Sequence, residues 1–110
     1  MKVLLDENLP HRLRLALEGH DVFSAKFMGW AGVKNGRLLA LIEEHSFEVF
    51  ITADQAMKGQ QNFSDRTVAM VYLTAQEWPV LSLRVPEILA AIRAALPGSI
   101  QVVDCGEFRR

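Results

Sequence analysis

The sequence predicts an α/β domain with three layers, α/β/α, around a mainly parallel sheet of about five strands. Three observations predict this fold. Apolar runs of strand length alternate with segments of helical periodicity along the whole chain. The runs around 3–5, 48–52 and 68–73 are rich in apolar residues without alternation, which is typical of strands covered on both faces. No repeat, low-complexity stretch or Pro/Gly/Ser-rich linker divides the chain, so residues 1–110 are expected to form one domain.

Turn and capping residues place the individual elements. Pro10 lies where a first helix begins, Asn8 is its expected cap, and Gly19 ends it. The other expected elements are a strand at 22–23, a helix over 35–45, a polar loop with room for one helical turn over 55–66, a helix over 86–96 and an edge strand at 100–103. The last helix is expected to carry Leu96 on its inward face. Strands that alternate with helices need crossover connections, and these connections make the sheet mainly parallel.

Composition and charge narrow the class of protein. Half of the residues are apolar, which is enough for a core, and the single cysteine, Cys105, excludes an internal disulfide. The first apolar run closes at Asp6, and no later run approaches the length of a membrane span. We therefore expect a cytoplasmic protein with no signal peptide and no membrane partner. The net charge of −1 argues against nucleic-acid binding by bulk charge, although basic residues near the strand ends leave a local basic surface open.

Two carboxylates follow predicted buried strands. Asp6 comes directly after the first strand, and Asp54 comes just past the strand at 48–52. The ligand crevice of such a sheet lies beyond the carboxyl ends of the strands where the strand order reverses, so we expect both acids there. Carboxylates that meet in a crevice repel one another, and Mg²⁺ or Mn²⁺ relieves that repulsion and can assist phosphodiester cleavage. The candidate metal ligands are Asp6, Asp54 and Glu7, and the alternative that these acids only cap helices and turns stays open.

Three stretches of the chain carry a resemblance to a known family. Residues 2–10 read KVLLDENLP, 19–22 read GHDV and 50–54 read FITAD. In this order they resemble a family of small bacterial PIN-like proteins, which includes VapC-like toxins. The segments 29–36 and 60–62 are similar to one branch of that family, and the match covers about the first 75 residues in order. The resemblance implies a PIN-like three-layer fold and cleavage of RNA that depends on Mg²⁺ or Mn²⁺.

The resemblance also implies roles for individual residues. Asp6 matches the first metal-binding acid of the family. Asp54 matches the acid that follows the central strand, and Thr52 matches the small hydroxyl residue of the same motif. Asn8 accompanies Asp6 in the opening motif and is expected to support it. The catalytic pair implied by the resemblance is therefore Asp6 and Asp54.

The chain departs from the family at the start of the middle helix. Active members of the family carry a further acid there, whereas residues 34–37 of this chain read KNGR. Two consequences stay open. Arg37 can pair with one of the two aspartates in place of a cation, which leaves the fold without strong nuclease activity. Alternatively Lys34, Arg37 and Lys58 can contact the phosphates of RNA.

Two other functions compete with the ribonuclease. A catalytically inactive PIN-like module acts through a protein partner, and the resemblance makes a cognate antitoxin and a homodimer the expected partners. A receiver domain of phosphorelay signalling carries a similar order of acids, with Asp54 as phosphoacceptor and Thr74 after the fourth strand. A receiver also needs a lysine after its fifth strand, where this chain has Asp104, Cys105 and Gly106. The expected function is therefore the ribonuclease toxin of a bacterial toxin–antitoxin pair.

Overall fold

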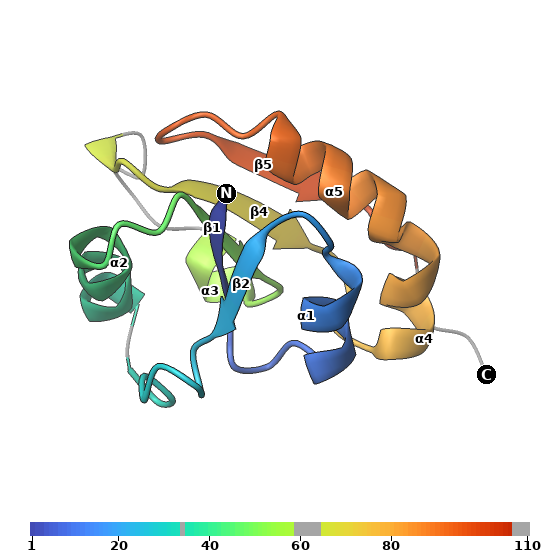
Figure 1. The fold of residues 1–110 in the computed structure, drawn as a ribbon, viewed down its shortest axis with the longest axis horizontal. Helices are drawn as coiled ribbons and strands as arrows, with labels where there is room; N and C mark the ends of the chain where they lie inside the picture. Colours follow the sequence, from blue (N-terminus) through green and yellow to red (C-terminus); the bar gives the residue numbers. More distant parts are fainter. Residues whose placement is uncertain (34, 59–64, 107–110) are drawn as a thin grey trace.

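The computed structural model describes residues 1–33, 35–58 and 65–106, without the side chains of Asn35 and Lys58, and contains a five-stranded sheet. All neighbouring strands are parallel, in the order β2-β1-β3-β4-β5 (Figure 1). The strands are β1 (Lys2–Leu5), β2 (Asp21–Ser24), β3 (Val49–Thr52), β4 (Ala69–Leu73) and β5 (Ile100–Val103). The α/β fold and the five-stranded sheet predicted from the sequence are thereby confirmed.

Helices cover both faces of the sheet and complete three layers. One face is covered by α1 (His11–Ala16), α4 (Trp78–Leu81) and α5 (Val85–Arg93). The opposite face is covered by α2 (Asn35–Glu44) and the single turn α3 (Gln55–Lys58). Figure 1 shows α2 on one side of the sheet and α1, α4 and α5 on the other.

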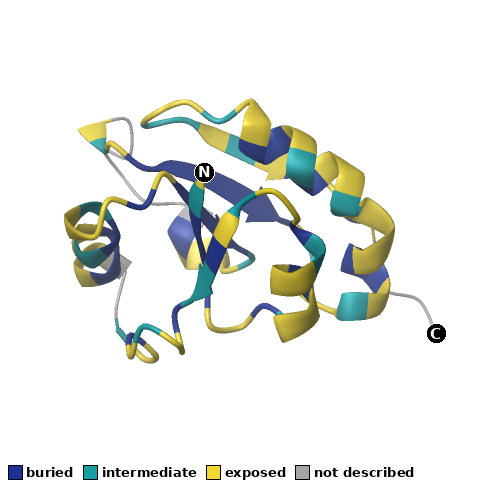
Figure 2. Cartoon of the chain, viewed as in Figure 1, coloured by how far each residue is buried: buried dark blue, intermediate teal, exposed yellow. Residues whose placement is uncertain are grey.

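The two faces of the strands form two separate cores. In β1, Val3 and Leu5 pack on the α1 side, whereas Leu4 packs on the α2 side. In β3, Ile51 and Phe50 divide between the two cores in the same way. Figure 2 shows β4 buried along its whole length, whereas the edge strands β2 and β5 include exposed residues. Burial on both faces explains why the central strands read as continuous apolar runs.

The strand order places the carboxyl ends of β1 and β3 side by side. From β1 the chain passes to β2 on one flank and then returns across β1 to β3, so the order reverses between β1 and β3. Asp6, the first residue after β1, extends this pairing because its N–H donates to the Ile51 carbonyl at 2.9 Å. Open α/β sheets bind ligands beyond such a reversal. The residues that follow β1 and β3 therefore form the candidate site.

Asn8 is not the cap of the first helix, contrary to the sequence prediction. The helix begins at His11, its N-cap residue is the extended Pro10, and no side chain caps it. The chain between β1 and α1 instead forms a turn in which the Leu9 N–H donates to the Asp6 carbonyl at 3.1 Å. Proline at the N-cap fixes an extended backbone and displaces the helix start by two residues from the predicted position.

Two helix ends also differ from the prediction. The first helix ends at Ala16 rather than at Gly19. Leu96 is 67 % exposed because α5 ends at Arg93, so Leu96 lies in the loop before β5 and not on the inward face of a helix. The helix α4 is absent from the predicted elements, since four residues are too few to show helical periodicity.

Candidate active site at the carboxyl edge of the sheet

Thr52 joins the two predicted acids at the carboxyl ends of β1 and β3. Its hydroxyl donates to Asp6 Oδ2 at 2.6 Å, and the same Oγ1 accepts the N–H of Asp54 at 3.0 Å. Thr52 is fully buried and Asp6 is 8 % exposed, whereas Asp54 is exposed. The structure therefore brings Asp6, Thr52 and Asp54 together at the strand ends.

Burial raises the pKa of Asp6 above its ordinary value of 3.8, because water is withdrawn from the carboxylate. Two hydrogen bonds oppose this effect, one from Thr52 and one from the Glu7 N–H to Asp6 Oδ1 at 2.8 Å. The negative charges of Asp54 and Glu7 raise the pKa of Asp6 further. Among the basic side chains that the structure describes, which leave out Lys34 and Lys58, none forms an ion pair with Asp6. The Asp6 carboxylate is thus hydrogen-bonded but has no ion-pair partner among the described side chains.

Asp54 starts the single turn of α3 and keeps one carboxylate oxygen free. Its Oδ1 accepts the N–H of Ala56 at 2.9 Å, and its carbonyl accepts the N–H of Met57 at 3.0 Å. The turn-capping role left open by the sequence is therefore present. Its Oδ2 accepts no hydrogen bond from any residue that the structure describes. Capping uses one oxygen and leaves the other available to a ligand.

Glu7 is engaged with the glycine-containing loop that precedes α2. Both of its carboxylate oxygens lie 3.2 Å from the backbone nitrogen of Gly32, which donates to them. Gly32 has a φ of +80°, a conformation that favours glycine. In the described part of the chain, no group of three His, Cys, Asp or Glu side chains is arranged to hold a metal ion. Glu7 as a third metal ligand remains a prediction.

The free lone pairs of Asp6 and Asp54 fit a divalent cation of the Mg²⁺ or Mn²⁺ type. Each Asp6 oxygen accepts one hydrogen bond and so retains a further lone pair, and Asp54 Oδ2 is also available. Mg²⁺ is commonly held by one or two carboxylates and keeps several waters. A cation would also offset the mutual repulsion that raises the pKa of Asp6. The donor set therefore suits a hard cation held partly through water.

A cleft of about 320 Å³ opens beside Asp6 on the α1 side of the sheet. We call it the α1–β2 cleft, and its lining residues are Leu5, Asp6, Glu7, Leu9, Pro10, His11, Arg14, Ser24 and Lys26. Three of them, His11, Arg14 and Lys26, are exposed basic side chains. The sequence did not lead us to predict Lys26 as a site residue. Lys26 lies two residues beyond the end of β2, so its place just after a strand, like that of Asp6, could have indicated it.

The residues predicted to contact phosphate are only partly described. Arg37 is exposed in the first turn of α2 and forms no ion pair with Asp6 or Asp54, so the proposed replacement of a cation by Arg37 is not present. Lys34 and the side chain of Lys58 lie outside the described residues. The crevice acids are therefore not neutralised by Arg37 in this structure.

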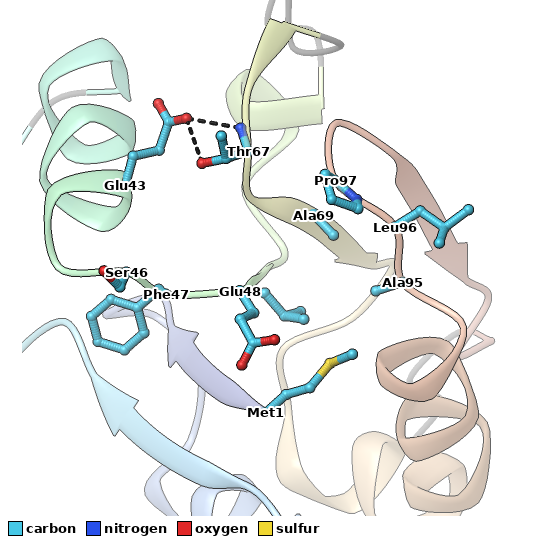
Figure 3. A pocket seen from close by; sticks show the side chains of 11 residues that line it. Met1, Glu43, Ser46, Phe47, Glu48, Thr67, Ala69, Ala95, Leu96 and Pro97 are labelled. Carbon is cyan, nitrogen blue, oxygen red and sulfur yellow. Dashed lines mark hydrogen bonds between the residues drawn. The ribbon is translucent and has the colours of Figure 1, made fainter.

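A second pocket, of about 380 Å³, lies at the opposite, amino edge of the sheet (Figure 3). It also contains acids, but they are paired. Glu43 accepts from the N–H and hydroxyl of Thr67, at 2.9 and 3.0 Å, and forms an ion pair with Arg66 at 2.7 Å. These contacts, led by the Thr67 N–H, lower the pKa of Glu43. Glu48 accepts the backbone N–H of Lys2 at 3.0 Å. Glu43 therefore has an ion-pair partner, whereas Asp6 has none among the described side chains.

Comparisons of the chain with family models, with curated proteins and with solved structures give no match. Among the described residues, no helix is both long enough and apolar enough to cross a membrane.

Replacing Thr52 by valine should destabilise the protein by about 1–3 kcal/mol, because Asp6 loses a donor and the Asp54 N–H loses its acceptor. Urea unfolding at pH 7 measures the change. The control is Thr52→Ser, which keeps the hydroxyl and should recover most of the loss. A larger loss for serine than for valine would show that the methyl group, rather than the hydrogen bonds, matters at this position.

Proposed function

We propose that the protein is a metal-dependent ribonuclease of the PIN-like type, in which Asp6 and Asp54 hold the cation. One observation carries the proposal: Asp6 is buried at the reversal of strand order without an ion-pair partner among the described side chains, and it is joined to Asp54 through Thr52. Burying an unpaired carboxylate costs stability, so such a residue in a ligand crevice favours a functional role. The resemblance of the stretches KVLLDENLP and FITAD to PIN-like proteins supports RNA as the substrate.

Each residue of the site has a definite part in this function. A bound Mg²⁺ or Mn²⁺ ion supplies activation of water and stabilisation of the charge that develops on the phosphodiester. Thr52 and the Glu7 N–H fix the Asp6 carboxylate by hydrogen bonds to different oxygens. Asp54 is fixed through its bond to Ala56 and offers its second oxygen. The Glu7 side chain holds the loop at Gly32 next to the crevice.

We further propose that this ribonuclease is the toxin of a bacterial toxin–antitoxin pair and acts in the cytoplasm. The support is the resemblance of the opening motif and the FITAD stretch to a family that contains such toxins. A cognate antitoxin is the expected partner, and a homodimer is the expected assembly. A short neighbouring gene whose product blocks RNA cleavage by this protein supports the assignment.

Cleavage should require the divalent cation and the charge of Asp54. We expect labelled single-stranded RNA to be cut with Mn²⁺ and to remain intact with EDTA. Asp54→Asn should lower the rate by at least about tenfold, while its amide oxygen still caps α3. The control is Asp104→Asn, because Asp104 also follows a strand and accepts the N–H of Gly106 at 2.9 Å, outside the crevice. Absence of Mn²⁺-dependent cleavage by the unmodified protein favours the inactive PIN-like module instead.

A receiver-like phosphoacceptor domain is the second candidate, because the strand order 2-1-3-4-5 is also that of receiver-type signalling proteins. Two features weigh against it. Thr74, at the position of the receiver hydroxyl, accepts the N–H of Cys105 at 2.8 Å. The sequence also contains no lysine after Lys58, whereas a receiver needs one beyond its fifth strand. Incubation with acetyl phosphate separates the two, since a receiver gains a phosphoryl group on Asp54 and the ribonuclease does not.

A further inference from the structure

The basic side chains of the α1–β2 cleft have no part in holding a cation. His11 and Arg14 come from α1, and Lys26 comes from the turn after β2, so two separate elements present them to one cleft. Asp6 lines the same cleft. One cleft therefore presents basic side chains together with the proposed metal ligand Asp6.

Arg14 is held so that part of its guanidinium remains available. Its Nε donates to the Val22 carbonyl of β2 at 2.9 Å, which fixes the orientation of the side chain. The preceding Leu13 is fully buried and anchors this turn of α1 on the sheet. The terminal nitrogens of Arg14 form no hydrogen bond or ion pair with any residue that the structure describes. A guanidinium presented in this way suits the oxygens of a phosphate group.

Lys26 is carried by an anchored turn. Ala25 is 2 % exposed, and its N–H donates to the Leu5 carbonyl at 2.9 Å. The N–H of Phe27 donates to Ser24 Oγ at 3.0 Å, which closes the turn around Lys26. The ammonium group of Lys26 is exposed and forms no ion pair within the described residues. Its backbone is thus fixed beside the cleft while its charge remains unpaired.

Acids and bases line this cleft without neutralising one another. Asp6 forms no ion pair, and neither do Arg14 and Lys26, among the residues that are described. A phosphodiester chain together with a divalent cation would satisfy both sets, because Asp6 would hold the cation and the basic side chains would hold a phosphate. We propose that Arg14 and Lys26 bind one phosphate group of an RNA strand, next to the phosphodiester that lies at Asp6. This proposal rests on the proposed function and adds the residues that position its substrate.

An RNA strand fits this cleft better than free phosphate, although both present the same oxygens. Arg14 and Lys26 are both exposed, and no buried side-chain nitrogen or oxygen among the described residues is left without a hydrogen-bond partner that a small ion could supply. Two exposed cations hold a lone phosphate weakly because water and salt screen them. A strand adds the interactions of its neighbouring phosphates and gains affinity by releasing several counterions. The cleft therefore acts as one contact along a longer ligand.

Fluorescence anisotropy with a labelled single-stranded RNA, in EDTA so that no cleavage occurs, tests this proposal. The double variant Arg14→Gln/Lys26→Gln should weaken binding by at least about tenfold and lower the salt dependence of binding. The control is Arg12→Gln, on the exposed surface of α1 but not in the cleft, which should change affinity by less than about twofold. Lys26→Gln alone should show part of the loss of RNA affinity. This variant removes no contact between the ammonium group and a described residue, so a change in folding does not account for the loss.

Equal affinities for the unmodified protein and the double variant would overturn the proposal, as would an equal loss in Arg12→Gln. Inorganic phosphate is the second probe. It should displace the RNA only at concentrations far above the dissociation constant of the RNA, and binding as tight as that of the RNA would assign the cleft to free phosphate. The assay contains no metal, so its failure is distinguishable from the failure of metal-dependent cleavage, which is measured separately.

Discussion

Asp6→Asn is expected to reduce Mn²⁺-dependent RNA cleavage by at least about 100-fold while leaving the protein folded. Loss of even an outer-shell partner of a metal ligand costs about 10–100-fold, and Asp6 is proposed to be a ligand itself. The amide is similar in size to the carboxylate and can still accept the Glu7 N–H that now bonds to Oδ1. The circular dichroism spectrum should therefore be unchanged when the activity is lost.

The same substitution has a predicted effect on the pH dependence of stability in the absence of metal. The pKa of Asp6 is raised in the folded protein above its ordinary value of 3.8, so the folded state holds this proton more tightly than the unfolded state. Ionisation of Asp6 therefore lowers stability as the pH rises from about 3.8 through the folded pKa. Below about pH 3.8 Asp6 is protonated in both the folded and the unfolded state, so it does not change the stability with pH.

Urea unfolding of Asp6→Asn and of the unmodified protein in EDTA, from pH 3 to pH 8, measures this effect. The difference between their free energies of unfolding should shift in favour of Asp6→Asn as the pH rises. Asp21→Asn is the control, because Asp21 is exposed at the amino end of β2 and far along the strand from the crevice. A shift of opposite sign would mean that Asp6 is stabilised as a carboxylate by a partner, and would remove the basis for a metal.

Phe50→Ala is expected to cost about 3–5 kcal/mol of stability, the largest effect of any single substitution considered. Phe50 is fully buried in the central strand β3 and belongs to the core on the α2 side. Removing the ring leaves a cavity between the sheet and α2 that strand backbones cannot close. Because the free energy of unfolding of such domains is about 5–15 kcal/mol, this substitution removes a large fraction of the stability.

The unfolding midpoint in urea at pH 7 measures this loss, with Phe27→Ala as the matched control. Phe27 is 76 % exposed, so its truncation should change stability by less than about 0.5 kcal/mol. Similar losses at the two positions would contradict the division of the protein into an interior sheet and outer turns.

The fold and the acid pair could be predicted because both follow from short patterns in the sequence. Continuous apolar runs marked β3 and β4 as strands covered on both faces, and acids within two residues of the ends of β1 and β3 marked the crevice. Thr52 was predicted to support the two aspartates, and it does so by donating a hydrogen bond to Asp6 and accepting one from the Asp54 N–H. In each case the pattern is local, and the parallel arrangement then brings the strand ends together.

The remaining features depend on contacts between distant residues. Glu7 bonds to Gly32, which lies 25 residues away, and no pattern in the sequence links the two. The backbone bond between Arg14 and Val22 arises only because α1 packs beside β2. The start of α1 depended on whether Asn8 or the rigid Pro10 took the N-cap position, and the local sequence suits both. Such outcomes are decided by tertiary packing rather than by propensity.

A crystal structure of the protein grown with Mn²⁺, with anomalous diffraction collected at the manganese absorption edge, tests the central proposal most directly. The proposal predicts one anomalous peak bound by carboxylate oxygens of both Asp6 and Asp54, completed by waters. Crystals of the Asp6→Asn variant, grown under the same conditions, should lack the anomalous peak. A crevice without manganese, or one in which the Arg37 guanidinium lies between the two aspartates, would contradict the assignment of a metal-dependent ribonuclease.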